Sequence, residues 1–195
     1  MNYLFFFFLC YRNAGIEAVK IPGIVKTSSY IPSDAIDPKF PNHEWNAVRL
    51  RAASGWHLID LTWAAGHIDR KSGEFRSDFN PHFLFTNPRD FVRDHLPSDP
   101  KWQMLCKPLT LKAFQSDLLL RPGYFHLGIL RCNMISGSIH CVSESTVVTF
   151  HLIQPLCFTY TLLQLATGFS VNQCVTLEWT PSQCTVRVFF PKPGP

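Results

Sequence analysis

The stretch from His43 to Trp63 holds a histidine and an aspartate at a spacing that could bring them into one site. It reads HEWNAVRLRAASGWHLIDLTW, which is two runs of alternating apolar residues around a short polar turn. We expect strands over residues 44–50 and 56–63, joined by a turn over residues 51–55. A tight hairpin of this kind places His43 near Asp60 on a shared face, with side chains about 5 Å apart.

A histidine held by an aspartate is two thirds of a nucleophile–His–Asp arrangement for acyl transfer. The carboxylate would fix the tautomer of the His43 ring and stabilise the imidazolium that forms when the ring takes up a proton. The alternative is a structural histidine at a loop–strand junction and an aspartate, Asp60, that belongs to its own turn. Spacing alone leaves both interpretations open.

Other groups with chemical potential are weaker candidates. We expect the loop carboxylates of Glu44, Asp69, Glu74 and Asp78 to be solvated, and the tryptophans Trp45, Trp56 and Trp63 to lie in the core. A metal set made of Cys132, His140 and Cys141 has little support, because the spacing matches no common zinc motif. The sequence therefore predicts no metal and no cofactor.

Composition limits the class of protein. The chain has 195 residues, of which 46% are hydrophobic and 16% are charged, so it can bury a core. The net charge of +4 comes from scattered Lys and Arg, which argues against nucleic-acid binding. The seven cysteines are odd in number and contain no C-x-x-C pair. We expect reduced, mostly buried thiols in an intracellular protein.

The N-terminal run Tyr3–Asn13 predicts the end of a helix that is apolar on nearly all sides and therefore buried. Gly15 suits the left-handed position that follows a helix C-terminus. The run lacks the basic region and the cleavage site of a secretory signal. The longest uncharged stretch, Val147–Ala166, is better explained by two strands than by a membrane span.

The remaining pattern predicts short elements throughout. Ile16–Lys26 reads as a strand broken at Pro22-Gly23, residues 64–78 as a polar loop, and Phe79–Phe85 as an aromatic strand. Asn87 and Pro88 open a helix that ends near His95-Leu96-Pro97, and Thr110 caps another. Five strand-like runs then indicate a β-sandwich of immunoglobulin type: Tyr124–Leu130, Thr146–Ile153, Cys157–Leu163, Gln173–Glu178 and Thr185–Phe190.

Several stretches together resemble the transglutaminase-like superfamily, and within it the kyphoscoliosis peptidase and hillarin-like branch. They are HEWNAV, WHLIDLTWAAG, AGIEAVKIPG, FNPHFLFTNPRDFVRDHLP and WQMLCKPLTLKAF. The similarity covers about Leu4 to Gly128, with a weaker match at VRVFFPKPG. It implies an α+β fold with a papain-like core, in which a helix packs against an antiparallel sheet. It also implies that His43 is the general base and Asp60 its orienting partner.

The family's nucleophilic cysteine does not carry over to this sequence. The resemblance puts it at the start of the core helix, in a C-x-G-Y-A type motif, and that position falls at or just before Met1. Cys10 lies in mid-helix, where it gains nothing from the helix dipole and where burial would raise its pKa. We therefore predict that Cys10 is not the nucleophile.

These inferences predict two domains: an N-terminally truncated transglutaminase-like domain over residues 1–123 and a partial β-sandwich over residues 124–195. We expect a non-catalytic binding or scaffold module that keeps His43 and Asp60. One alternative is a cysteine peptidase or protein-glutamine acyltransferase whose nucleophile lies upstream of Met1, so the sequence leaves open whether it is an enzyme. Another is a poorly folding fragment. The resemblance implies protein substrates or cytoskeletal partners and a cytoplasmic, cytoskeleton-associated location.

Overall fold

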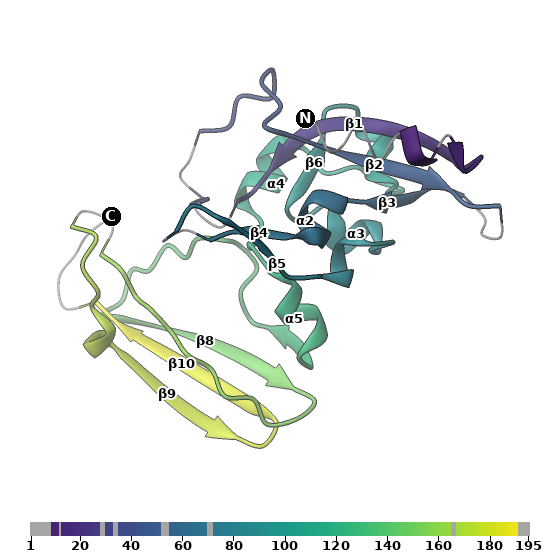
Figure 1. The fold of residues 1–195 in the computed structure, drawn as a ribbon. Helices are drawn as coiled ribbons and strands as arrows, with labels where there is room; N and C mark the ends of the chain where they lie inside the picture. Colours follow the sequence, from purple (N-terminus) through teal and green to yellow (C-terminus); the bar gives the residue numbers. More distant parts are fainter. Residues whose placement is uncertain are drawn as a thin grey trace. The chain divides into compact units, whose positions relative to one another are not determined.

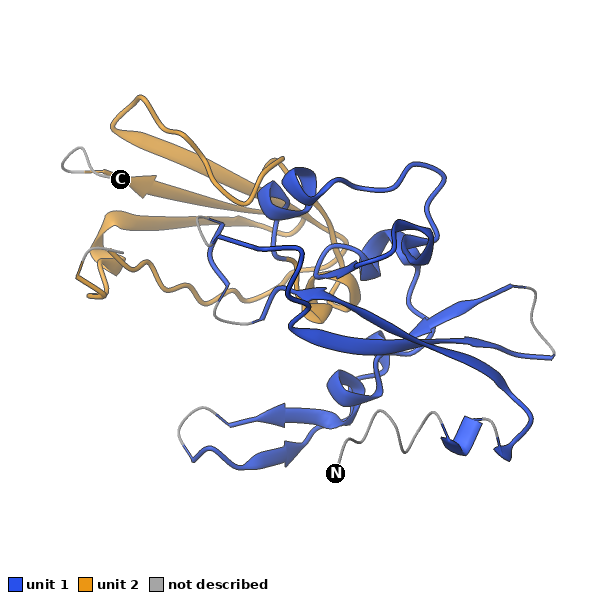
Figure 2. Ribbon diagram, turned by 90° about the horizontal axis from the view of Figure 1, so that it is seen from above, with its two compact units in different colours: residues 1–119 blue, residues 120–195 orange. Residues whose placement is uncertain are grey.

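The structure is a computed structural model. It describes residues 9–11, 13–27, 30–32, 35–51, 55–69, 72–164 and 167–190. The chain divides into two compact units, Met1–Leu119 and Leu120–Pro195, which Figure 2 colours separately. Each unit contains short helices and antiparallel strands, so the predicted α+β class is confirmed. The papain-like core and the assignment of the units as domains of particular families stay predictions.

The first unit is built on a four-stranded antiparallel sheet with the order β3-β2-β1-β6, whose strands lie side by side in Figure 1. A small hairpin and several short helices complete it. The strands are β1 (Glu17–Val25), β2 (His43–Arg49), β3 (His57–Ile59), β4 (Gly66–Ile68), β5 (Phe75–Ser77) and β6 (His95–Pro97). The helices are α2 (Leu61–Ala65), η1 (Pro81–Phe83), α3 (Pro88–Phe91), η2 (Pro100–Gln103) and α4 (Leu111–Ser116).

Strand β1 is continuous, so the predicted break at Pro22-Gly23 is wrong. Pro22 is tolerated because the register of β6 with β1 begins at Gly23, and the Pro22 carbonyl still accepts a hydrogen bond from the Ser98 amide at 3.0 Å. Gly23 is needed for a different reason. A Cβ at this position would lie 2.3 Å from the Trp45 ring and 2.4 Å from the Leu96 carbonyl oxygen. The absence of a side chain lets β2 and β6 close on both sides of β1.

The predicted hairpin forms, but its second strand is shorter than expected. Strand β3 ends at Ile59, and Asp60 is the N-cap of helix α2 rather than a strand residue. Its carboxylate accepts a hydrogen bond from the Trp63 amide at 3.0 Å. An aspartate in this position satisfies an amide that the first helical turn leaves free, which ends the strand and starts the helix.

Other boundaries also differ from the sequence-based prediction. The predicted loop over residues 64–78 contains the hairpin of β4 and β5. The predicted strand Phe79–Phe85 contains the helix η1, and only Leu84 in it forms a β-bridge. Helix α3 opens as predicted, with the Asn87 side chain accepting from the Arg89 amide, but it ends at Phe91. Thr110 caps α4 as predicted, by accepting from the Ala113 amide.

Two apolar clusters fill the first unit. The larger contains Trp45, Ala47, Leu58, Phe83 and Phe91 among its buried members, and Trp56 and Trp63 pack against it. The predicted core role of the three hairpin tryptophans is therefore confirmed. The smaller cluster comprises Ile24, Val92, Leu96 and Phe114. Together they cover the sheet around the ends of β1 and β6.

Only the last part of the predicted N-terminal helix lies within the described residues. Residues 9–11 and 13 are helical, and Gly15 follows with a φ of +69°, as predicted for a helix C-terminus. Leu9 and Cys10 are exposed, so this part of the helix is not buried as predicted. The run before Leu9 lies outside the described residues. In the part of the chain that is described, no helix is both long and apolar enough to span a membrane.

The second unit has one four-stranded antiparallel sheet with the order β7-β8-β10-β9. Its strands are β7 (Ile129–Cys132), β8 (Ser145–Leu152), β9 (Val175–Thr180) and β10 (Gln183–Phe189), accompanied by α5 (Pro122–His126) and η3 (Asn172–Cys174). The predicted strand Tyr124–Leu130 begins instead as α5, and the predicted strand Cys157–Leu163 forms only a bridge between Leu163 and Ser170. A second sheet, which a sandwich requires, is not seen in residues 120–164 and 167–190.

All seven cysteines are free, as predicted. Their predicted burial is wrong, because only Cys184 is buried. Cys10, Cys106 and Cys157 are exposed, and the other three are intermediate.

Candidate active site

His43 is held at the first position of β2 by the residue before it. The Asn42 side chain accepts a hydrogen bond from the Val25 amide at 2.8 Å and donates to the Val25 carbonyl at 3.2 Å. The Asn42 amide also donates to the Gly23 carbonyl at 3.1 Å. These three bonds continue the β1–β2 ladder past its end and fix the backbone that carries His43.

Asp60 meets His43 from the end of the neighbouring strand. His43 Nε2 lies 2.6 Å from Asp60 Oδ2, and the aspartate is fully buried while 15% of the His43 side chain is exposed. Burial alone would raise the pKa of Asp60. Hydrogen bonds from His43 and His95, with the charges of both rings, outweigh burial and hold this pKa well below its usual range. Asp60 is therefore a carboxylate at neutral pH.

A second histidine lies behind the aspartate, and sequence reasoning missed it. His95 Nε2 lies 3.1 Å from the same oxygen, Asp60 Oδ2, and His95 Nδ1 lies 2.6 Å from Asp94 Oδ1. His95 is fully buried in the short strand β6, opposite Val25 of β1. The only sequence signal was that DHLP lay in one of the stretches that carried the family resemblance.

The arrangement can do one kind of chemistry. With Asp60 ionised, His43 Nε2 keeps its proton and donates a hydrogen bond to the carboxylate, which leaves Nδ1 as the basic nitrogen. Among the described residues, Nδ1 has no hydrogen-bond partner. His43 can thus take up a proton from a group outside the cluster while Asp60 stabilises the resulting charge.

None of the seven cysteines, all of which lie in described residues, hydrogen-bonds to His43. This side chain hydrogen-bonds to Asp60 and makes ring contacts with Trp45, Trp63 and His95. Cys10 is exposed rather than buried, which corrects one reason for rejecting it as the nucleophile. That Cys10 is not the nucleophile stays a prediction.

His43, Asp60 and His95 also form a group whose donor atoms lie within 4.8 Å of one another, as metal ligands do. The distances fit a metal poorly. Donors on one tetrahedral zinc ion stand about 3.3 Å apart, because each bond is about 2.0–2.1 Å. The His43–Asp60 separation of 2.6 Å is a hydrogen-bond distance, so an ion could enter only if these atoms moved apart.

The weaker candidates are not brought into this site. Glu44 pairs with Lys20 at 2.9 Å, Asp69 with Arg76 at 3.4 Å, and Glu74 is exposed. Asp78 is also exposed, so the predicted solvation is confirmed for Glu74 and Asp78, whereas Glu44 and Asp69 are only partly exposed. Among the described residues, Cys132, His140 and Cys141 form no metal-binding group.

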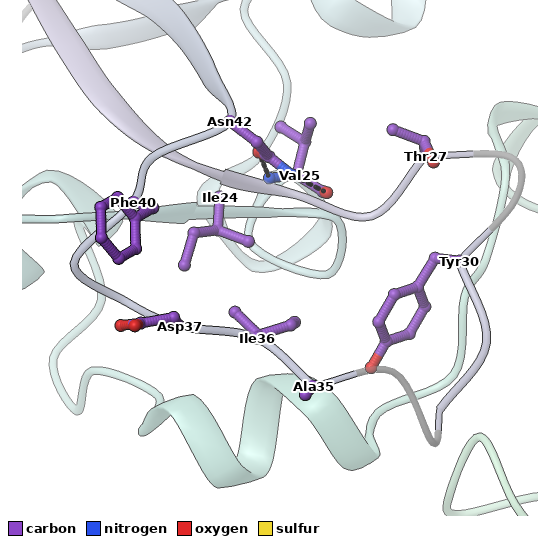
Figure 3. Close-up of a pocket in the computed structure, with 9 residues that line it drawn as sticks. All are labelled: Ile24, Val25, Thr27, Tyr30, Ala35, Ile36, Asp37, Phe40 and Asn42. Atoms are coloured by element: carbon purple, nitrogen blue, oxygen red, sulfur yellow. Dashed lines mark hydrogen bonds between the residues drawn. The ribbon is translucent and has the colours of Figure 1, made fainter.

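A pocket of about 290 Å³ lies next to the site without including its reactive groups (Figure 3). It is lined by Ile24, Val25, Thr27, Tyr30, Ala35, Ile36, Asp37, Phe40 and Asn42. Asn42 therefore has the pocket on one side and His43 next to it in the chain. The lining is about equally polar and apolar, with Asp37 as its one ionisable carboxylate, so we assign it no chemistry.

Comparison with characterised proteins places these residues in context. No protein-family model matches the chain. It is 30% identical over 151 residues to kyphoscoliosis peptidase of Mus musculus, which covers 77% of this chain and 22% of that protein. It is 27% identical to hillarin of Drosophila melanogaster, covering 73% and 18%, respectively. It is 25% identical to the Lim and transglutaminase domain protein ltd-1 of Caenorhabditis elegans, covering 93% and 28%. The chain thus spans about a fifth to a quarter of the length of these relatives.

Proposed function

Because the chain is related to the kyphoscoliosis peptidase and hillarin branch of the transglutaminase-like proteins, we propose that it carries the base and orienting residues of an acyl-transfer site without their nucleophile. His43 and Asp60 are the inherited pair. In this proposal the chain is a non-catalytic protein-binding or scaffold module.

The observation that carries the proposal is the buried contact between His43 and Asp60 at 2.6 Å. A partly exposed histidine whose partner carboxylate is fully buried is the arrangement that a general base needs. The lack of a thiol among the contacts of His43 supports the non-catalytic form, because the members of a nucleophile–His–Asp unit act together and lose nearly all activity when one is missing.

The test is covalent labelling of the purified chain with a glutamine-mimicking electrophilic peptide at neutral pH. We expect equal labelling of the chain and of the His43→Gln variant, because the three exposed cysteines react without a base. His67→Gln serves as the matched control, since this side chain is exposed and lies outside the site. Labelling of any cysteine that depends on His43 and not on His67 would overturn the non-catalytic proposal.

A second candidate function is a cysteine peptidase or protein-glutamine acyltransferase whose nucleophile lies in sequence upstream of Met1. The free Nδ1 of His43 favours it, because this nitrogen is positioned to take a proton from an incoming thiol. Amine incorporation into a glutamine-containing protein separates the candidates. We expect it only from a longer natural product of the gene with a cysteine upstream, and it should disappear in the His43→Gln form.

We further propose protein partners of the cytoskeleton and a cytoplasmic location. The support is the family relationship alone. Co-sedimentation of the purified chain with actin filaments tests it, with a His43→Gln variant to show that binding does not need the site. A chain that stays in the supernatant at every filament concentration counts against an actin partner.

A further inference from the structure

The buried cluster contains two imidazoles that share one carboxylate oxygen. Asp60 Oδ2 accepts from His43 at 2.6 Å and from His95 at 3.1 Å, while Asp60 Oδ1 accepts from the Trp63 amide at 3.0 Å. The order of contacts is His43, Asp60, His95, Asp94. The acyl-transfer roles described above use only the first two.

The proton count on His95 follows from its partners. Both of its ring nitrogens face carboxylate oxygens, and an ionised carboxylate can only accept. Both nitrogens must therefore carry protons, which makes the His95 ring an imidazolium. Burial opposes this charge, but Asp94 and Asp60 together raise the pKa of His95 to about 9.

The surroundings of His95 leave its ring no freedom. The Phe91, Trp63 and Trp45 rings have centroids 4.2, 4.6 and 5.1 Å from it. Its backbone is paired with β1 on the other side. A fixed, charged donor on Asp60 Oδ2 holds the carboxylate in one orientation and withdraws part of its negative charge from His43.

We propose that His95, itself held by Asp94, is a positioning residue that sets the orientation of Asp60 and thereby the hydrogen bond that Asp60 accepts from His43. This inference rests on the proposed function, since it concerns the same base. The ionisable groups around His95 are Asp60 at the start of α2, Asp94 beside it and His43 on β2. Lys26, which follows β1, interacts with the charge of Asp94.

The test uses the whole chain with ¹⁵N-labelled histidine and follows both rings by NMR from pH 5 to 9. In the unaltered protein we expect His95 to show two protonated nitrogens at pH 7 and no titration below about pH 8. We expect neutral His43 to be the Nε2-protonated tautomer. A neutral His95 at pH 7 overturns the proposal without any variant.

The decisive variant is Asp94→Asn with His95→Gln, which keeps a neutral donor toward Asp60 and removes one buried charge of each sign. Because this variant replaces a charged donor on Asp60 Oδ2 by a neutral one, we expect the ¹⁵N and ¹H chemical shifts of the His43 Nε2–H group to change while its tautomer stays the same. Arg93→Gln is the matched control, because Arg93 pairs with Asp117 at 3.1 Å away from the cluster. Unchanged His43 Nε2–H signals in a folded double variant overturn the proposal.

These readouts need neither a nucleophile nor a substrate. His43-dependent labelling would overturn the non-catalytic function and leave the positioning role intact. A folded double variant with unchanged His43 Nε2–H signals would overturn the positioning role and leave the non-catalytic function intact.

Discussion

The two units of the chain bury different kinds of residue. Within the described part of the chain, every buried polar or charged residue belongs to the first unit: Lys26, Asn46, Asp60, His82, Asp94, His95 and Gln103. Among its described residues, the second unit buries only Leu152, Val175 and Cys184. It leaves large apolar side chains such as Ile135 and Val142 more than nine-tenths exposed.

This difference has a physical basis. A buried ion costs several kcal/mol unless partners compensate it, so a unit can hold a charged cluster only if its framework is rigid enough to keep those partners in place. The first unit has such a framework in the two apolar clusters that pack with its sheet. In the described part of the second unit, the four-stranded sheet has few enclosed positions. The chemistry therefore belongs to the first unit. We expect the same kind of substitution to change stability more in the first unit than in the second.

The largest contrast is expected at two glycines. Gly23→Ala puts a Cβ into the Trp45 ring and the Leu96 carbonyl, which should lower the free energy of unfolding by about 3 kcal/mol or more. Gly123→Ala, in helix α5 of the second unit, meets nothing closer than 3.4 Å and should stabilise by about 0.5 kcal/mol. Urea unfolding measures both. If both variants lowered the free energy of unfolding equally, close approach at β1 would not be what makes the first unit rigid.

The next contrast concerns pH. The pKa of His95 is about 9 in the folded chain and about 6.5 in an unfolded one. Its contribution to the free energy of unfolding is therefore complete below pH 6.5 and is lost as pH rises toward 9. Between pH 6.5 and 8 the free energy of unfolding of the first unit should fall by about 2 kcal/mol. Burial lowers the pKa of Lys26 to about 8. Above pH 8 this group therefore raises the free energy of unfolding as pH increases, which is opposite to the effect of His95.

Tryptophan fluorescence can separate the units in this experiment. Trp179 is the one tryptophan of the second unit, so a Trp179→Phe variant reports the first unit alone. In the Asp94→Asn/His95→Gln variant, the free energy of unfolding of the first unit should no longer fall between pH 6.5 and 8. A slope that persists in that variant would assign the pH dependence to other groups.

The smallest contrast involves two asparagines that make the same pair of bonds. Asn42 spans the amide and carbonyl of Val25, and Asn133 spans the Thr149 amide and the Val147 carbonyl. Asn42→Ala removes two partly buried bonds, so it should cost about 1–2 kcal/mol and broaden the His43 NMR signals. Asn133→Ala removes two exposed bonds, so it should cost less than about 1 kcal/mol. Thermal unfolding gives both values. A larger cost at Asn133 would reverse the ranking of the two units.

The contact between His43 and Asp60 could be anticipated from the sequence, because the alternation and turn length of the hairpin limit where the two residues can meet. The local structure that brings Asp60 to His43 could not be anticipated. The sequence suggested a longer strand, but Asp60 finds a better local partner in the Trp63 amide and ends β3. The caps at Asn87 and Thr110 were predictable because capping depends on a few neighbouring residues.

His95 could not be found by the same reasoning. Its strand has three residues and pairs with β1 across a large gap in the chain, so no local periodicity indicates it. The exposure of Leu9 and Cys10 was missed for a related reason. An apolar run shows that a segment can be buried, but only the tertiary structure shows whether anything covers it.

Asp60 performs two tasks, since it caps α2 and also receives both imidazoles. In evolutionary terms, these tasks place different constraints on the two members of the pair. A lineage that lost its thiol would still need an aspartate at this position to begin the helix and to balance the buried cation. The partly exposed His43 is under no such constraint, since its ring makes one hydrogen bond. Among relatives, loss of the histidine should therefore follow loss of catalysis sooner than loss of the aspartate.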